Sequence, residues 1–526
     1  MRLAFKFFIL ISVLLFLSSC NSEGQPTEAT SSSVYTEKHR PQFHFSPDSA
    51  WMNDPNGMVY FDGEYHLFYQ YYPDSTVWGP MHWGHAVSTD LVHWNHLPIA
   101  LYPDSLGYIF SGSAVLDVEN SSGLGSKEKP PLVAIFTHHD PVLEKSGATD
   151  TFQYQSIAYS QDRGRTWLKY KGNPVLRNPG FRDFRDPKVF WHDESQKWIM
   201  VLAVKDHVQF YSSSNLINWS FLSDFGKHVG SHAGVWECPD LIRLQDENGE
   251  EYWVLLQNMN PGNPNGGSGL QYFVGQFDGK YFTLDKAFAK LLDDMDSEDA
   301  SIWLDAGRDN YAGVTWSNVP KADGRCLFIG WMSNWSYAQI VPTERWRSAM
   351  TIVSELKLRK LDGIPRLIMD PVDAMDKLFK GDNISVEGNG QYDLNGGLAK
   401  LVIQCSINDM SKLGFRFFND LEQEIAFSFD ASNNVFEFDR SQSGHVDFNG
   451  LFALPANVSR ISNDSILNIE VFLDHSSIEI FLDDGLNVFT ELFFSDKPFD
   501  KLELFAEQSN VKWVNGTLTE LKGIWQ

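Results

Sequence analysis

Residues 51–57, Trp51-Met52-Asn53-Asp54-Pro55-Asn56-Gly57, open a unit that recurs along the chain. They are followed by an apolar run, a turn at Asp62-Gly63 and a second apolar run, which is the pattern of two β-strands joined by a hairpin. Arg185-Asp186-Pro187 and Trp236-Glu237-Cys238-Pro239-Asp240 open two more units of this kind. An acid beside a proline therefore leads into a predicted hairpin three times.

A second motif, a short polar turn that leads to a tryptophan, also recurs. It occupies residues 88–94, 160–167 and 213–219. Repetition at a period of roughly fifty residues predicts the blades of a β-propeller, in which four-stranded sheets surround a central channel. The period is irregular, which a long loop at residues 120–131 would explain.

Three acids occupy equivalent places in the repeated units. The first strand of each blade lines the axis of a propeller, so we expect Asp54, Asp186 and Glu237 to meet although they are far apart in the sequence. Glycoside cleavage requires two carboxyl groups, an ionised nucleophile and a protonated acid. A retaining enzyme holds them about 5 to 5.5 Å apart, a distance that acids on neighbouring inner strands can meet.

Aromatic and polar residues accompany the acidic motifs. Sugars present apolar faces edged with hydroxyl groups, so their sites combine aromatic platforms with hydrogen-bonding side chains. The candidates are Trp51, Gln70, Trp78, Phe110, Ser111, Trp236 and Trp335. Tryptophans also pack propeller cores, and this is the simpler interpretation of each one except Trp51 and Trp236, which adjoin the acids.

The composition limits the classes of function. A chain of 526 residues exceeds one ordinary domain, and 43% hydrophobic with 14% aromatic residues is typical of a well-packed globular protein. The formal net charge of −26 argues against a nucleic-acid partner and suits a neutral polar substrate. The scattered Cys238, Cys326 and Cys405 predict buried thiols. The pair His138-His139 is interpreted as two polar residues in a loop that bind no metal. We predict no metal and no cofactor.

The N-terminus has the features of an export signal. Basic residues precede an apolar run at 7–17 that is too short to span a bilayer permanently, and Leu17-Ser18-Ser19-Cys20 resembles a bacterial lipoprotein processing box. We predict a signal peptide at 1–19, a lipid anchor on Cys20 and a flexible tether at 20–36. The expected location lies beyond the inner membrane of a bacterium, periplasmic or at the cell surface. An ordinary cleaved signal is the alternative.

The C-terminal part of the chain changes character. We predict that the propeller occupies residues 37–358 and that a linker follows at 359–378, where Pro365 and Pro371 interrupt a polar stretch. Beyond it, short alternating patterns separated by turns predict a β-sandwich at 379–526. The whole fold is therefore expected to be all-β.

At its acidic motifs the chain resembles glycoside hydrolase family 32, the invertases, levanases and inulinases that act on β-fructofuranosyl linkages. Further stretches that match are Phe110-Ser111-Gly112-Ser113, Asp305-Ala306-Gly307 with Tyr311-Ala312, Gly330-Trp331-Met332, Trp346-Arg347-Ser348-Ala349-Met350-Thr351, Asp439-Arg440-Ser441-Gln442-Ser443-Gly444 and Asp474-His475-Ser476-Ser477-Ile478-Glu479. The resemblance implies a five-bladed propeller followed by a β-sandwich. The chain differs from the family after Thr351, where Ile352-Val353-Ser354-Glu355-Leu356 stands in place of a Leu-Pro-Arg-Glu-Leu-like stretch. This difference affects the expected junction between the domains and leaves the catalytic assignment unchanged.

The resemblance also implies roles for individual residues. Asp54 looks like the nucleophile, Glu237 like the general acid/base, and Asp186 like the acid that binds fructose hydroxyls and stabilises the transition state. Arg185 would hold the geometry and charge of the carboxylates. Contacts with the terminal fructosyl unit are implied for Asn53, Gln70, Trp78, Phe110 and Ser111, and we add Trp51 and Trp335 as aromatic substrate contacts.

The expected function is that of a retaining β-fructosidase that hydrolyses fructans such as levan or inulin by releasing fructose from chain ends, with sucrose as a further candidate substrate. An endo-acting levanase is the alternative within this activity. A five-bladed hydrolase of arabinan or xylan would share the fold and the acids, but not the residue sequences of the motifs at 51–57 and 236–240. A surface protein that binds fructan without cleaving it would not need a nucleophile and an acid. Substrate preference, mode of attack and oligomeric state stay open.

Overall fold

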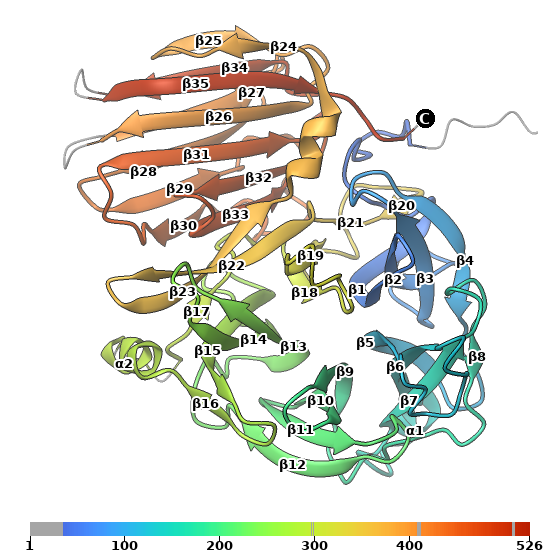
Figure 1. The fold of residues 1–526 in the computed structure, drawn as a ribbon. Helices are drawn as coiled ribbons and strands as arrows, with labels where there is room; N and C mark the ends of the chain where they lie inside the picture. The colour runs from blue at the N-terminus through green and yellow to red at the C-terminus, as the bar shows by residue number, and fades with distance from the viewer. Residues whose placement is uncertain (1–34, 296, 298, 408–411, 508–510, 526) are drawn as a thin grey trace, which may run out of the picture.

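The computed structural model describes residues 35–295, 297, 299–407, 412–507 and 511–525. Over these ranges the chain forms a β-propeller followed by a β-sandwich (Figure 1). Strands dominate, and α1 (Pro141–Ser146) and α2 (Lys286–Asp294) are short helices. The predicted signal peptide, Cys20 and the tether as far as residue 34 lie outside the described residues. Within the ranges given, no helix is long and apolar enough to cross a membrane.

Five sheets within the described residues form the blades of the propeller, and their first strands contact one another around the axis (Figure 1). In blade order, the strands are β1 (Ala50–Phe61), β2 (Glu64–Tyr72), β3 (His82–Ser88) and β4 (Asn95–Leu101); β5 (Tyr108–Leu116), β6 (Leu132–His139), β7 (Gln153–Ser160) and β8 (Leu168–Lys169); β9 (Arg185–His192), β10 (Lys197–Val204), β11 (His207–Ser213) and β12 (Ser220–Phe225); β13 (Val235–Gln245), β14 (Glu251–Asn260), β15 (Gly269–Phe277) and β16 (Phe282–Leu284); β18 (Tyr311–Thr315), β19 (Leu327–Met332), β22 (Ser354–Leu361) and β23 (Ile364–Pro371). The predicted propeller is confirmed.

The propeller ring is closed by strands from its two ends. β20 (Trp346–Arg347) pairs in parallel with β1 through Ala50 and Trp51, so a segment that follows β19 of the last blade completes the first. Two further short strands extend individual blades: β17 (Ile302–Trp303) pairs with β15 in the fourth blade, and β21 (Ala349–Met350) pairs with β19 in the fifth. Closure pairs a sheet edge that would otherwise be open and fixes the inner strands relative to one another.

The predicted hairpins are present, but the acids lie inside the first strands rather than before them. In β1, β9 and β13 the pairing register shifts beside Asp54, Asp186 and Glu237. A proline follows each acid within two residues and cannot donate a ladder hydrogen bond, so the strand bulges there instead of ending. Such bulges redirect side chains, and here they turn the acids toward a common site.

The turn motif that recurs in the sequence connects the third and fourth strands of the first three blades. Asp90, Asp162 and Asn215 each accept a backbone N–H bond from the residue two or four positions further on. These are local side-chain turns, in which a short polar side chain replaces a backbone acceptor. The motif therefore marks the same place in each of these blades.

The β-sandwich consists of two six-stranded sheets within the described residues. One sheet is ordered β24 (Phe379–Ser385), β35 (Lys512–Leu521), β26 (Ala399–Ser406), β31 (Ile466–Leu473), β32 (Ser477–Leu482) and β33 (Asn487–Leu492), and the other β25 (Gly390–Asp393), β34 (Lys501–Ala506), β27 (Lys412–Phe418), β28 (Glu424–Asp430), β29 (Val435–Asp439) and β30 (Ala456–Ser459). Alternate residues face the core, as Ile425, Phe427 and Phe429 do in β28. The predicted sandwich is confirmed.

The junction between the domains differs from the linker predicted at 359–378. Residues up to Pro371 belong to β22 and β23 of the fifth blade, and the connection is a 3-10 helix, η1 (Asp373–Leu378), which leads directly into β24. The prolines were misleading because β23 is the edge strand of its sheet, where Pro365 and Pro371 need not break the ladder. The last blade therefore ends at Pro371 rather than at residue 358.

Candidate active site

The inner strands of all five blades carry irregular backbone around the axis. Register shifts occur in β1, β5, β9, β13 and β18, and Asp186, Cys238 and Ala312 have positive φ values of 64°, 42° and 52°. Residues other than glycine rarely adopt this conformation, and it is found at functional sites. The bulged segments bring side chains from five blades into one space.

Asp54, from the first blade, is held by two hydrogen bonds. The Ser111 hydroxyl of the second blade donates to Oδ2 at 2.7 Å, and the Asn53 amide donates to Oδ1 at 2.8 Å. Burial raises the pKa of Asp54 and the charge of Glu237 adds to the rise, whereas the bonds from Ser111 and Asn53 oppose it. The two donors therefore favour the ionised carboxylate that a nucleophile requires.

Arg185 and Asp186, from the third blade, lie between the other acids. Arg185 Nη2 donates to Glu237 Oε1 at 2.9 Å, Nη1 donates to Asp183 Oδ1 at 2.6 Å, and Nε lies 3.8 Å from Asp186 Oδ2. Burial raises the pKa of Asp186 to about 7; Arg185 opposes the rise, and Glu237 and Asp54 add to it. The acids are thus close enough to affect one another's protonation.

Glu237, from the fourth blade, is held at both of its oxygens. Oε1 accepts from Arg185, and Oε2 accepts a hydrogen bond from the Tyr311 hydroxyl of the fifth blade. Burial raises the pKa of Tyr311 well above its ordinary value, and the charge of Glu237 adds to this, so the phenol remains a donor. The Glu237 side chain is 21% exposed, against 6% for Asp186. Glu237 is therefore the more accessible of these two acids.

Cys238 lies between two of the carboxylates. Its thiol is 3.6 Å from Asp54 Oδ2 and 3.7 Å from Asp186 Oδ2, and its backbone N–H donates to Asp186 Oδ2 at 3.0 Å. Burial raises the pKa of Cys238 well above its ordinary value, and the adjacent carboxylates add to the rise. The thiol therefore stays protonated and acts as a weak donor rather than as a nucleophile.

Trp51 does not face the open pocket, contrary to the expectation of a direct substrate contact. It is fully buried, and its indole Nε1 donates to Asn53 Oδ1 at 2.7 Å. Because Asn53 in turn donates to Asp54, Trp51 orients the amide beside that acid. Gln70 is also buried, and its Nε2 has no hydrogen-bond partner among the described residues. An unpaired buried amide beside this site could donate to a sugar hydroxyl.

Aromatic rings line the rim of the site. Trp78 is 37% exposed, and its ring centroid lies 6.1 Å from that of Phe110. Phe110 stacks on His139 with centroids 4.4 Å apart, and Trp335, half-buried, packs 5.8 Å from Trp51. Phe110 adjoins Ser111, which donates to Asp54, and Trp335 packs on Trp51, which donates to Asn53, so these rings lie close to the first acid.

Two residues at the site have no role predicted from the sequence. Tyr311 was visible only as a member of a family motif, and it lies 74 residues from Glu237. His139, which backs Phe110, was interpreted as loop polarity. Trp236, in contrast, belongs to the core, with its Nε1 donating to the Ser231 carbonyl at 2.9 Å. A contact between blades, such as that of Tyr311 with Glu237, leaves no signal in local sequence.

The chemistry available at this site is that of glycosidic bond cleavage. Asp54, to which Ser111 and Asn53 donate, lies near Glu237, the more accessible of the other two acids. Asp186 and aromatic rings lie nearby, as a sugar substrate requires. The fold and the site together define a glycoside hydrolase of the propeller type.

Comparison with known proteins identifies the family. The glycosyl hydrolases family 32 N-terminal domain matches residues 44–371, and the family 32 C-terminal domain matches residues 374–520. The chain therefore belongs to glycoside hydrolase family 32. Both the family and the enzyme class predicted from the sequence are confirmed.

Several known proteins are similar over nearly the whole chain. Levanase from Bacillus subtilis (strain 168) is 43% identical, covering 98% of this chain and 75% of that protein. Extracellular exo-inulinase from Aspergillus awamori is 36% identical, covering 93% of this chain and 96% of that protein. The crystal structure of the A. awamori exo-inulinase has a TM-score of 0.86 at 35% identity, covering 93% of this chain and 100% of that one.

Proposed function

We propose that this β-fructosidase works by double displacement. In the first step the Asp54 carboxylate bonds to C2 of the fructosyl unit while the bond from C2 to the glycosidic oxygen breaks, and the Glu237 carboxyl group protonates that oxygen. In the second step Glu237 takes a proton from water, the water oxygen bonds to C2, and the ester to Asp54 breaks. The configuration at C2 is retained.

The different surroundings of the three carboxyl groups are the observation that carries this assignment. Asp54 accepts hydrogen bonds from Ser111 and Asn53 that oppose the rise of its pKa. Glu237 is more accessible than Asp186, as a group that meets the leaving oxygen must be. Asp186, buried between them, suits binding of fructose hydroxyls and stabilisation of the positive charge that develops in the transition state.

The acid/base role of Glu237 is tested with two kinds of substrate. Glu237→Gln should lower turnover of fructan by at least about 10²-fold, because the leaving oxygen is no longer protonated. An aryl β-fructofuranoside, whose leaving group needs no proton, should lose much less in its first step. Equal losses on both substrates would argue against the role.

Retention is tested in the presence of methanol as acceptor. Double displacement predicts methyl β-fructofuranoside as the transfer product, identified by NMR. A methyl α-fructofuranoside product would rule out the covalent intermediate on Asp54.

The proposed substrates are fructans, attacked from their ends, and also sucrose. Similar proteins are a levanase and an exo-inulinase, and the aromatic rim of Trp78, Phe110 and Trp335 beside the acids supports a pocket for a terminal unit. Timed product analysis on levan and inulin tests this. Free fructose from the first minutes is expected, and a ladder of oligosaccharides would show endo attack instead.

We further propose that the protein is exported across the inner membrane of a bacterium and anchored by a lipid on Cys20. The support is the pattern of residues 7–20. Labelling with radioactive palmitate should mark the protein, and Cys20→Ala should lose both the label and the membrane association. An unlabelled native protein would refute the anchor. Protease treatment of intact cells then distinguishes a periplasmic from a surface location.

A further inference from the structure

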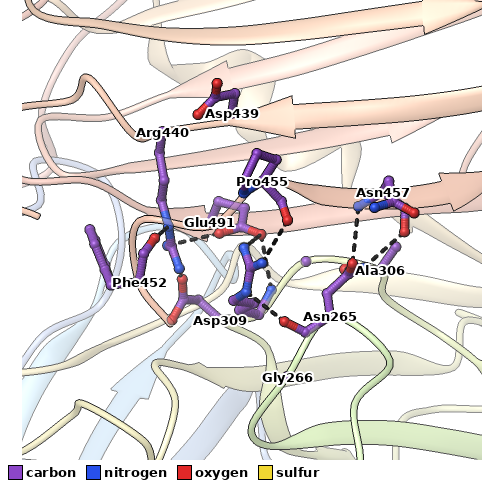
Figure 2. Close-up of polar contacts among 12 residues, drawn as sticks. Asn265, Gly266, Ala306, Asp309, Asp439, Arg440, Phe452, Pro455, Asn457 and Glu491 are labelled. Atoms are coloured by element: carbon purple, nitrogen blue, oxygen red, sulfur yellow. Dashed lines mark hydrogen bonds and ion pairs between the residues drawn. The ribbon is translucent and has the colours of Figure 1, made fainter. Parts of the chain in front are cut away.

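A buried cluster of charged side chains joins the propeller to the sandwich (Figure 2). Arg308 and Asp309 come from the loop that leads into β18, and Arg440 and Glu491 come from the sandwich. All four side chains are at most 2% exposed. The double-displacement chemistry does not use this cluster, yet Asp309 lies two residues before Tyr311, which contacts Glu237.

Arg440 is the centre of the cluster. Its Nη1 lies 2.7 Å from Asp309 Oδ2 and 2.7 Å from Glu491 Oε2. Its Nη2 donates to the Tyr337 hydroxyl at 3.0 Å, and its Nε donates to the Phe452 carbonyl at 2.7 Å. The planar, forked guanidinium thus binds groups of both domains at once, which a point charge such as that of lysine cannot do equally well.

The loop that carries Asp309 lies against β33 of the sandwich. Asp309 N donates to the Thr490 carbonyl at 3.0 Å, and Leu492 N donates to Asp309 Oδ2 at 2.9 Å. Asp305 Oδ2 accepts from the Thr490 hydroxyl at 2.6 Å. A Cβ at Gly307 would lie 2.3 Å from the Thr490 carbonyl oxygen, so the two backbones touch with no space between them. The loop therefore takes its position from the sandwich.

The same loop reaches the catalytic acid. Tyr311, two residues after Asp309, is the first residue of β18, and its hydroxyl donates to Glu237 Oε2. Asn310, between them, is pinned by its own side chain, which donates to Asp305 Oδ2 at 3.0 Å. Displacement of Asp309 would consequently move the donor that holds Glu237.

A second branch of these contacts reaches the pocket rim. The Tyr337 hydroxyl donates to Asp309 Oδ1 at 2.6 Å, and the Asn334 side chain donates to the Arg308 carbonyl at 2.9 Å. These residues flank Trp335, whose ring is part of the rim. Both branches depend on the segment that Arg440 holds.

We propose that Arg440 is a positioning residue for the hydrolytic reaction: by fixing Asp309 it places the Tyr311 hydroxyl on Glu237 and so orients the acid/base. The inference rests on the role proposed for Glu237. The sandwich thereby contributes to catalysis without touching the substrate. Small misplacements of a catalytic group are costly, because proton transfer depends on aligned atoms at hydrogen-bond distance.

The first test compares Arg440→Met with Arg460→Met. Arg460 is a similarly buried sandwich arginine, 3% exposed and paired with Asp483 at 2.6 Å. Its side chain donates to Asp483 and to the carbonyls of Asp464 and Ile466, which all belong to the sandwich. Arg440→Met should lower kcat on fructan by about tenfold with KM within about twofold of the native value. Arg460→Met should leave kcat unchanged while lowering Tm similarly. Equal effects of both variants on kcat would overturn the proposal.

The second test asks whether Arg440 acts through Tyr311. Arg440→Met added to Tyr311→Phe should lower kcat no further than Tyr311→Phe alone, because residues that act through one contact are not additive. Additive losses would overturn the proposal. If Arg440→Met does not fold, Asp309→Asn, which keeps the shape of the side chain, takes its place in the same cycle.

A third measurement separates this proposal from the role of Glu237 itself. Turnover of an aryl β-fructofuranoside in the first step should be spared by Arg440→Met, as it should be by Glu237→Gln, while turnover of fructan falls. If Glu237→Gln keeps full activity on fructan, the acid/base assignment fails whatever Arg440 does. If the Arg440 variant loses turnover of both substrates equally while Glu237→Gln spares the aryl substrate, the positioning proposal alone is overturned.

Discussion

Two buried clusters of charge in this protein are built from the same residue types and serve different ends. The cluster at the axis contains the acids Asp54, Asp186 and Glu237 with one arginine, Arg185, which pairs with Asp186 and Glu237. The cluster at the interface contains two acids and two arginines: Asp309, Glu491, Arg308 and Arg440. Glu237 at the axis is 21% exposed, and the interface side chains are at most 2% exposed. The axis cluster has an excess of acids and is partly exposed, whereas the interface cluster has equal numbers of acidic and basic side chains and is buried.

The comparison shows what distinguishes the acids proposed to be catalytic from the acids at the interface. Burial raises the pKa of Asp186 to about 7, and it raises the pKa of Glu491 to about 7 as well, although Arg440 and Arg308 oppose this. A shifted pKa is therefore not sufficient to mark a catalytic group, as ion-pair networks shift pKa values too. Access to substrate and an excess of carboxylates are what set the axis cluster apart.

The largest expected effect is at the axis. Asp54→Asn should lower kcat on fructan by at least about 10³-fold, since no nucleophile remains. Tm should be unchanged or higher, because burying the charged carboxylate is unfavourable and the amide avoids this. Steady-state rates and calorimetry measure both. Asp62→Asn, in the exposed turn of the same hairpin, is the control and should keep full activity; a similarly active Asp54→Asn would refute the nucleophile.

The second effect is on stability and belongs to the interface. Arg440→Met leaves the Asp309 and Glu491 carboxylates buried without their shared cation, which should cost about 3 to 5 kcal/mol of unfolding free energy. Urea unfolding measures the loss. Arg416→Met, which removes part-exposed pairs with Glu424 and Glu503, should cost less than about 1 kcal/mol. Similar losses would show that the interface cluster is no more important than a surface pair.

A third cluster extends the comparison to pH. His44 Nδ1 lies 2.8 Å from Asp474 Oδ2, and Nε2 lies 2.8 Å from Glu479 Oε1. Burial lowers the pKa of His44, but the two carboxylates outweigh it and raise the value to about 9. The folded pKa lies above the ordinary value of about 6.5. The stability that protonated His44 contributes is therefore complete below about pH 6.5 and is lost as pH rises through the folded pKa.

The stability conferred by His44 is therefore expected to be lost on the alkaline side. Tm of the native protein should fall as pH rises from about 7 to about 10, and His44→Gln should flatten this part of the profile. Thermal unfolding over that range checks both expectations. A native Tm that rises with pH there would contradict the proposed sign.

The smallest effect concerns the environment of the nucleophile. Ser111→Ala removes a hydrogen bond that lowers the pKa of Asp54, so that pKa should rise further. The acid limb of the kcat/KM profile should then move to higher pH, by up to about one unit. Ser113→Ala is the matched control, because Ser113 bonds to the Pro187 carbonyl and not to an acid. A shift to lower pH would contradict the assignment.

Much of the fold was predictable because strand patterns are local. Alternation of apolar residues indicated the hairpins and the sandwich, and the acid-proline pairs indicated which strands line the axis. The bulges at the acids were not predicted, since proline was read as the start of a strand rather than as a break inside it. Pro365 and Pro371, in contrast, were interpreted as interruptions in a linker, although they lie in the edge strand β23, and this placed the end of the propeller too early.

The site was predictable to the extent that residue type implies a role. The motifs indicated the three acids, and the structure brings them together. Trp51 shows the limit: its position beside Asp54 predicted a sugar contact, but the indole points into the core and donates to Asn53. Which face of a strand is open depends on its register with the next strand, and a bulge changes that register.

By itself, the sequence determined the all-β class, the repeated blades, the family and the identity of the three acids, because these depend on spacing and residue type along the chain. The tertiary structure alone decided which groups besides Arg185 hold the acids. Tyr311 meets Glu237 across 74 residues, and Arg440 meets Asp309 across 131. Contacts at such separations follow from ring closure and domain packing, which bring together segments whose local sequences carry no mark of one another.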